Sequence, residues 1–134
     1  MTKYLLDTNH FSAYLDGHAV LVPRVNSVVR CGDRVGICLP VLFEYRAGIR
    51  LGRYYQRNLD RLRQSLSVFR LWPMDADTAA EYEELFAICR KQGRVLSQFD
   101  LVIAAIARQH QLVVLTADQD FTAILDLPKE NWLM

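Results

Sequence analysis

Three short apolar runs, separated by helix-length amphipathic segments, constrain the fold of this chain more than any other feature. The runs span residues 4–6, 35–39 and 112–115, and none alternates between apolar and polar side chains. Continuous apolar strands are typical of a sheet that is covered on both faces. Strands that alternate with helices predict an α/β fold of three layers, with a central parallel sheet flanked by helices.

The segments between these runs carry start and stop signals for helices, such as Asp7 and Ser97 at capping positions and Gly93 at a helix end. The chain has 134 residues, of which 51% are hydrophobic. We therefore expect residues 1–134 to form a single domain with an ordinary core. Helices are predicted over residues 11–15, 19–29, 40–49, 54–68, 75–91 and 97–107, and further short strands over 69–72 and 132–133.

Four acidic side chains are expected at one edge of this sheet. Asp7 directly follows the first apolar run, and Asp118 follows the run at 112–115. Glu44 lies near the start of the helix after the second run, and Asp100 lies near the start of the alanine-rich helix. Ligands of open α/β sheets bind beyond the carboxyl ends of the strands, so these four are the candidate functional residues.

Carboxylates that lie close together need positive charge nearby to offset their mutual repulsion. Two of them about 5 Å apart repel each other by roughly 3 kcal/mol at an effective dielectric constant of about 20. No lysine or histidine occupies a matching strand end where it would offset this repulsion. A set of oxygen ligands favours a hard divalent cation such as Mg²⁺ or Mn²⁺. Such a site can hydrolyse a phosphodiester.

Each acid also has an ordinary structural interpretation. Asp7 can cap the helix that follows it, and Asp100 can complement the dipole of its own helix. Asp118 and Asp120 can be turn residues. These interpretations stay open for single positions, and it is the combination of positions that favours a metal site.

The formal net charge of +1 hides an uneven distribution. Residues 46–70 are rich in arginine, whereas residues 75–84 are rich in aspartate and glutamate. A basic stripe can follow a phosphate backbone, although a solvated helix face would look the same. The arginines of the stripe are Arg46, Arg50, Arg53, Arg57, Arg61, Arg63 and Arg70.

Other classes of function receive little support. The histidines lack the spacing of a zinc site, and His10, which follows the Asp7 motif, is expected to be exposed to solvent. No glycine-rich phosphate loop is present. No apolar run approaches the roughly 20 residues of a membrane span, and no secretory signal opens the chain. We therefore expect a cytoplasmic protein without membrane association.

Over nearly its whole length the chain resembles the PIN-domain family, and specifically the VapC-type toxins of bacterial toxin–antitoxin pairs. Any single block of this resemblance is weak, but their order and separation together are specific. The blocks are YLLDTN at 4–9, VLFEYRAG at 41–48, DLVIAAIA at 100–107, VLTADQDF at 114–121 and ENW at 130–132.

The resemblance implies a PIN-like fold and an RNA endonuclease that depends on Mg²⁺ or Mn²⁺. Asp7, Glu44, Asp100 and Asp118 would form its acidic metal site, with Asp120 as an outer contributor. The family further implies a homodimer and a cognate antitoxin that occupies the active-site groove. The opening block is similar to members that cut initiator transfer RNA. Supporting residues that would orient water or ligands are Thr8 or Asn9 and Thr116.

Two other functions are weighed against this one. A phosphatase with an aspartate nucleophile usually needs a second acid two residues later, but Asn9 stands at that position. A non-catalytic PIN-like module that binds RNA or a protein would carry the same acids for structural reasons. It would bind RNA without cleaving it in Mn²⁺.

Overall fold

The computed structural model describes residues 1–134 and contains one five-stranded parallel sheet, in agreement with the predicted fold class. The spatial order of the strands is β3-β2-β1-β4-β5. Central strand β1 pairs Tyr4 with Val35 of β2 and Leu5 with Val114 of β4. The strands are β1 (Lys3–Leu6), β2 (Arg34–Ile37), β3 (Arg70–Leu71), β4 (Val113–Leu115) and β5 (Lys129–Glu130).

The predicted helices are confirmed, and three of them begin at a side chain that caps the first turn. Asp7, Asp75 and Ser97 each accept a hydrogen bond from a backbone N–H of the first helical turn. Gly93, just after a helix, has a φ of 68°, a conformation that glycine adopts without strain. The helices are α1 (Thr8–Leu15), α2 (Leu21–Arg30), α3 (Leu39–Arg50), α4 (Tyr55–Ser65), α5 (Ala76–Lys91), α6 (Gln98–His110) and a 3₁₀ turn, η1 (Gln119–Ala123).

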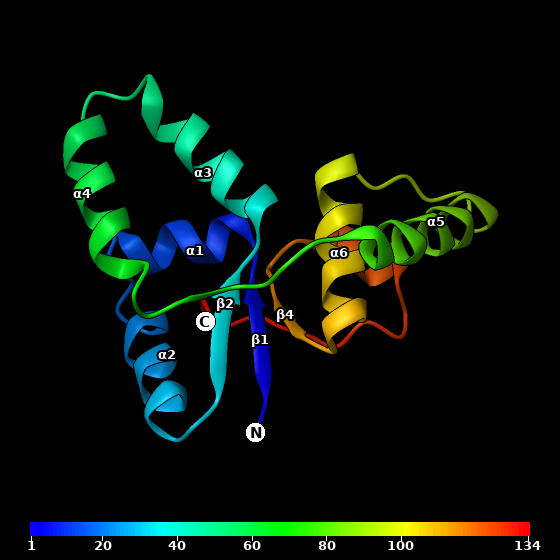
Figure 1. The fold of residues 1–134 in the computed structure, drawn as a ribbon, viewed down its shortest axis with the longest axis horizontal. Coiled ribbons are helices and arrows are strands. Elements are labelled where there is room, and N and C mark those ends of the chain that lie inside the picture. Colours follow the sequence, from blue (N-terminus) through cyan, green and yellow to red (C-terminus); the bar gives the residue numbers. More distant parts are fainter.

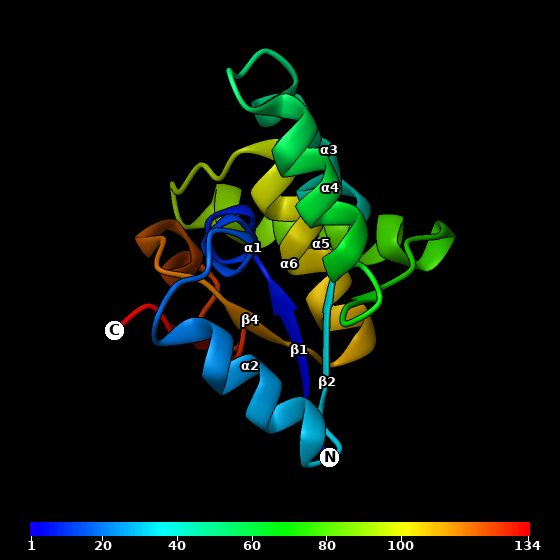
Figure 2. The same ribbon diagram turned by 90° about the vertical axis from the view of Figure 1, so that its left-hand side faces the viewer.

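The helices form two outer layers around the sheet. Figure 1 shows α1, α2 and α4 on one side of the strands and α5 and α6 on the other, and Figure 2 views the first of these layers face on. Leu5, Leu6, Val114 and Leu115 of the central strands are completely buried, as expected of strands covered on both faces. None of the helices combines the length and the hydropathy that a membrane span requires.

The order of the strands creates a switch point next to β1. From β1 the chain adds β2 and then β3 on one side, and it later returns to add β4 and β5 on the other. The connections that leave β1 and β4 therefore diverge to opposite sides, which leaves a crevice above the ends of these two strands. Asp7 directly follows β1, so its side chain belongs to this crevice.

Two expectations from the sequence are wrong, and they share a cause. The last strand is Lys129–Glu130 and not Trp132–Leu133, because Trp132 buries its ring against Tyr4, with 4.8 Å between ring centroids. His10 is completely buried and not exposed. The residues after β5 fold back over the start of α1, and this long-range contact leaves no trace in local patterns.

Gly36 in β2 lies where the backbone of β3 and the side chain of Trp72 approach β2 closely. A Cβ atom at this position would lie 2.5 Å from the carbonyl oxygen of Arg70 and 2.5 Å from Nε1 of Trp72, which donates a hydrogen bond to the Tyr4 carbonyl. We expect Gly36→Ala to lower the free energy of unfolding by about 1–3 kcal/mol, because the backbone of β3 must move. Urea unfolding measures this difference.

Gly48 in α3 provides the matched control. A Cβ atom there meets nothing within 4 Å. Gly48→Ala should therefore raise the free energy of unfolding by about 0.5–1 kcal/mol, the gain in helix propensity. Equal stability of the two variants would contradict the close packing of β2 against β3.

Candidate metal centre

A polar pocket of about 250 Å³ lies at the carboxyl edge of the sheet. The walls come from the turn after β1, from α3, from the start of α6 and from the turn after β4. No lysine, arginine or histidine is among the lining side chains, which makes the pocket strongly acidic. The lining residues are Asp7, Thr8, Asn9, Glu44, Ser97, Asp100, Ile103 and Asp118.

Asp7 lines this pocket and is the most buried of its acids. Its backbone N–H donates to the carbonyl of Leu115 at 3.1 Å, which ties the end of β1 to the end of β4. Its Oδ1 accepts the N–H of His10 at 2.7 Å and so caps α1. The capping interpretation of Asp7 is therefore correct, and the same residue also lines the pocket.

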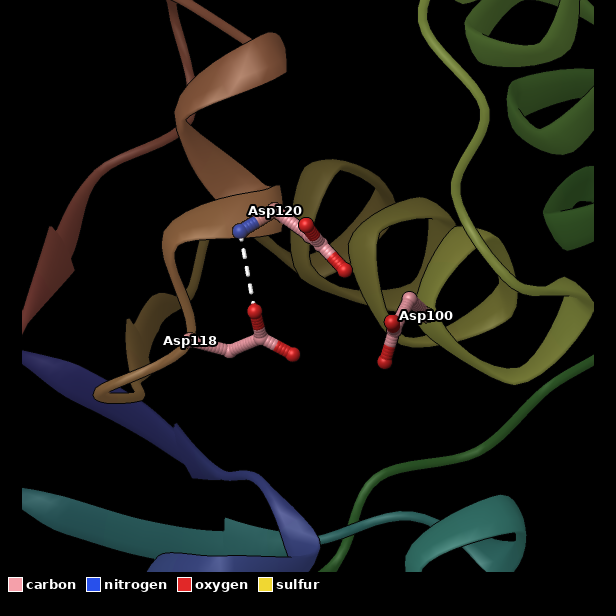
Figure 3. A group of neighbouring side chains, drawn as sticks. All are labelled: Asp100, Asp118 and Asp120. Atoms are coloured by element: carbon pink, nitrogen blue, oxygen red, sulfur yellow. Dashed lines mark hydrogen bonds between the residues drawn. The ribbon is translucent and has the colours of Figure 1, made fainter.

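Asp100, Asp118 and Asp120 form the tightest group of carboxylates. One oxygen from each lies within 4.8 Å of the others, and Figure 3 shows them gathered between α6 and the turn that leads into η1. The N–H of Asp120 donates to Oδ1 of Asp118 at 2.9 Å, and the N–H of Asp118 donates to Thr116 at 3.0 Å. These hydrogen bonds hold Asp118 and Asp120 in place in the turn after β4.

Glu44 reaches the pocket from the second turn of α3 and is exposed to solvent. The hydroxyl of Thr8 donates to its Oε1 at 3.2 Å, which links α3 to the start of α1 across the pocket. Asn9 is exposed beside Thr8 at the rim. This bond gives Thr8, rather than Asn9, a visible part in orienting a carboxylate.

The structure thus brings the predicted acids together from four separate segments. Thr116 and Asp120 do not line the pocket but bond to Asp118, and Asp120 lies closer to Asp100 than an outer role suggested. Sequence reasoning placed Ser97 at the start of its helix but missed it as a pocket residue; its Oγ accepts the N–H of Asp100 at 3.1 Å.

The electrostatics of the pocket oppose ionisation of Asp100. Burial raises the pKa of Asp100 above its usual value, and neighbouring negative charges raise it further, while a hydrogen bond to Ser97 lowers it. The charges that contribute are those of Asp118, Glu44 and Asp120. A cation in the pocket would reverse this trend by favouring the charged form.

The donor set fits a hard divalent cation. Carboxylate and hydroxyl oxygens dominate the lining, and neither sulfur nor imidazole nitrogen takes part. Such a cation prefers oxygen ligands, and it would compensate the charge that no basic side chain in the lining offsets. The arrangement can therefore hold a divalent cation.

The sequence of this chain matches the model of a known protein family. The family model of the PIN domain matches residues 4–126, which include every acid of the pocket. The chain belongs to the PIN domain family. The resemblance stated from the sequence blocks is thereby confirmed.

Two relatives of this PIN domain carry ribonuclease names. Ribonuclease VapC5 of Mycobacterium tuberculosis is 30% identical over 125 residues, which cover 90% of this chain and 86% of the relative. Ribonuclease VapC2 of Haemophilus influenzae is 25% identical over 135 residues, which cover 99% of this chain and all of the relative. The similarity therefore extends over nearly the full length of both proteins.

A solved structure shares the fold closely. DNA-bound VapBC from Salmonella typhimurium contains a chain with a TM-score of 0.88 to this PIN domain and 25% sequence identity. The match covers 98% of this chain and 99% of the other. The three-layer architecture is thus common to both proteins.

The raised pKa of Asp100 leads to a prediction about stability without divalent cations. A raised pKa means that the folded protein holds this proton more tightly than the unfolded chain does, so stability is lost as the pH rises through the raised pKa. We expect Asp100→Asn to have a higher urea midpoint than the wild type at pH 7 in EDTA. The difference should vanish below the ordinary pKa of about 3.9.

Asp126 provides the control for this measurement, because it is exposed and lies outside the pocket. Asp126→Asn should leave the midpoint unchanged across the same pH range. A wild-type protein that is at least as stable as Asp100→Asn at pH 7 would show that the pocket does not penalise the charge.

Proposed function

We propose that this protein is a metal-dependent endoribonuclease that acts as the toxin of a VapBC-type pair and is neutralised by a cognate antitoxin. The observation that supports this most is the convergence of carboxylates from four segments in one pocket whose lining includes no basic side chain. Membership of the PIN domain family and similarity to ribonucleases named VapC support the same activity.

The proposed catalytic residues and metal ligands are Asp7, Glu44, Asp100 and Asp118, with Mg²⁺ or Mn²⁺ as the cofactor. When bound, a divalent cation supplies activation of the attacking water and stabilisation of the leaving oxygen. The chain's own part is to hold the oxygen ligands in fixed positions. Asp120 then completes the ligand set beside Asp118, consistent with the short distances among these carboxylates.

Two hydrogen bonds, one in the pocket and one beside it, keep these ligands in place before RNA arrives. Thr8 holds Glu44 by a hydrogen bond, and Thr116 holds the turn that carries Asp118. Preorganised ligands lower the cost of reaching the transition state, since no side chain must be ordered at that moment. Attack of water in line with the leaving 3′ oxygen gives a 5′-phosphate and a 3′-hydroxyl.

The arginines of α3 and α4 offer a route for the RNA backbone toward the pocket. Arg50 lies over the ring of Tyr55 at 4.9 Å, and Arg57 lies over the ring of Tyr54 at 4.5 Å. Both arginines are exposed, so they can contact phosphates in solution. We propose RNA, with transfer RNA among the candidates, as the substrate, and the cytoplasm as the place of action.

The partners follow from the same proposal. Similarity to a VapBC complex supports a cognate antitoxin, which would inhibit by occupying the acidic pocket. We further propose that the toxin acts as a homodimer. Sedimentation of the purified protein would measure this state directly.

Loss of one pocket carboxylate should abolish RNA cleavage without unfolding the protein. We expect purified Asp7→Asn and Asp100→Asn to lack cleavage in Mn²⁺, because each removes a charged ligand. Asparagine still caps a helix at position 7, so circular dichroism should show native helix content. The exposed control Asp126→Asn should cleave RNA at the wild-type rate.

Sequencing of RNA ends after brief expression in cells, with Asp7→Asn as the reference, would identify the RNA that is cut. Cleavage by Asp7→Asn at the wild-type rate would overturn the assignment of this site. RNA binding without cleavage by the wild type would instead support the non-catalytic PIN-like module.

The toxin role makes a separate prediction. Expression of the wild type should arrest bacterial growth, and co-expression of a short protein encoded beside this chain should restore it. Asp100→Asn should not arrest growth, although it should still bind that protein. Growth inhibition that no neighbouring protein relieves would argue against the toxin role and leave the nuclease role intact.

A further inference from the structure

His10 is a completely buried histidine that the proposed function leaves without a task. The side chain lies in the first turn of α1, three residues after Asp7, and both of its ring nitrogens have partners. Nδ1 lies 3.2 Å from Oδ1 of Asp7. Nε2 lies 3.1 Å from the backbone nitrogen of Trp132.

The partner of Nε2 fixes the position of the ring proton. A backbone N–H can only donate, so Nε2 must be the nitrogen without a proton. A ring nitrogen that accepts a hydrogen bond carries no hydrogen, so the tautomer that fits this contact has its hydrogen on the other nitrogen. The single ring proton is therefore on Nδ1, from which it is donated to Asp7.

This bond determines which oxygen of Asp7 is free. The N–H of His10 and its Nδ1–H both donate to Oδ1, at 2.7 Å and 3.2 Å. Two donors on one oxygen fix the rotation of the carboxylate and leave Oδ2 free of these protein donors. A carboxylate held in this way presents one oxygen to the pocket without having to be ordered when a ligand binds.

The hydrogen bond between His10 and Asp7 depends in turn on Trp132, near the C-terminus. Trp132 is buried, and its ring packs 4.8 Å from that of Tyr4 in β1 and carries the guanidinium of Arg24 at 4.2 Å. These contacts fix the backbone of Trp132, and that backbone fixes the tautomer of His10. The C-terminal segment thus reaches the pocket through a chain of two hydrogen bonds.

We propose that His10 is a positioning residue for the metal centre, which holds Asp7 through an Nδ1–H tautomer imposed by the backbone of Trp132. This inference rests on the proposed function, because it takes Asp7 to be a metal ligand. Outer partners that orient a metal ligand typically change metal affinity by about 10–100-fold when they are lost.

Two amide variants separate the two hydrogen bonds of His10. The amide of His10→Asn lies where Nδ1 stood and can still donate to Asp7. The amide of His10→Gln lies where Nε2 stood, so it can accept from Trp132 but has no donor for Asp7. Each variant keeps a polar group in the buried site, and urea unfolding measures how much stability each one loses.

The test is Mn²⁺ binding to the wild type and both variants, measured by calorimetry without RNA. We expect His10→Gln to bind Mn²⁺ about 10-fold more weakly or worse, and His10→Asn to stay within about threefold of the wild type. Wild-type affinity in His10→Gln, or equal weakening in both variants, would overturn the inference. Failure of the wild type itself to bind Mn²⁺ would instead contradict the proposed function.

A second measurement needs no variant. Nitrogen-15 NMR of the wild-type imidazole without metal distinguishes a protonated Nδ1 from a protonated Nε2. We expect the His10 signal of the Nδ1–H tautomer. A proton on Nε2 would overturn the inference, because the bond to Asp7 would then have no donor.

Discussion

Repulsion among carboxylates at one edge of the sheet is the constraint on which the rest of this structure depends. Parallel strands place their carboxyl ends together, so the acids after β1 and β4 must lie close to each other. The buried strands beneath them supply the stability that keeps the acids in place. The buried sheet that creates the pocket therefore has to offset the free-energy cost of the repulsion among the acids.

The local parts of this fold could be predicted from the sequence, since they depend on neighbours in the chain. The continuous apolar runs predicted β1, β2 and β4, and the capping residues Asp7 and Ser97 marked the starts of two helices. The burial of His10 could not be predicted in this way. It depends on a hydrogen bond from Trp132, which lies 122 residues away along the chain.

The site likewise has local features that the sequence predicts and long-range features that it does not. Acidic residue types at strand ends were visible in the sequence, and the topology of a parallel sheet was enough to expect them at one edge. The distances among them were not visible, because they depend on how α6 packs against β4 and on the turn that ends at η1. Asp120 illustrates this, since its place beside Asp100 comes from the N–H bond to Asp118.

Asp7 is the residue in which stability and function meet. Its carboxylate caps α1, its backbone ties β1 to β4, and its side chain lines the acidic pocket. A carboxylate so buried would be costly if it were free to turn, because each rotation would break a hydrogen bond at a position largely shielded from solvent. The hydrogen bonds from the backbone N–H and the ring of His10 remove that freedom. The fixed orientation of the carboxylate that the fold requires is therefore also the orientation that binding a cation would require.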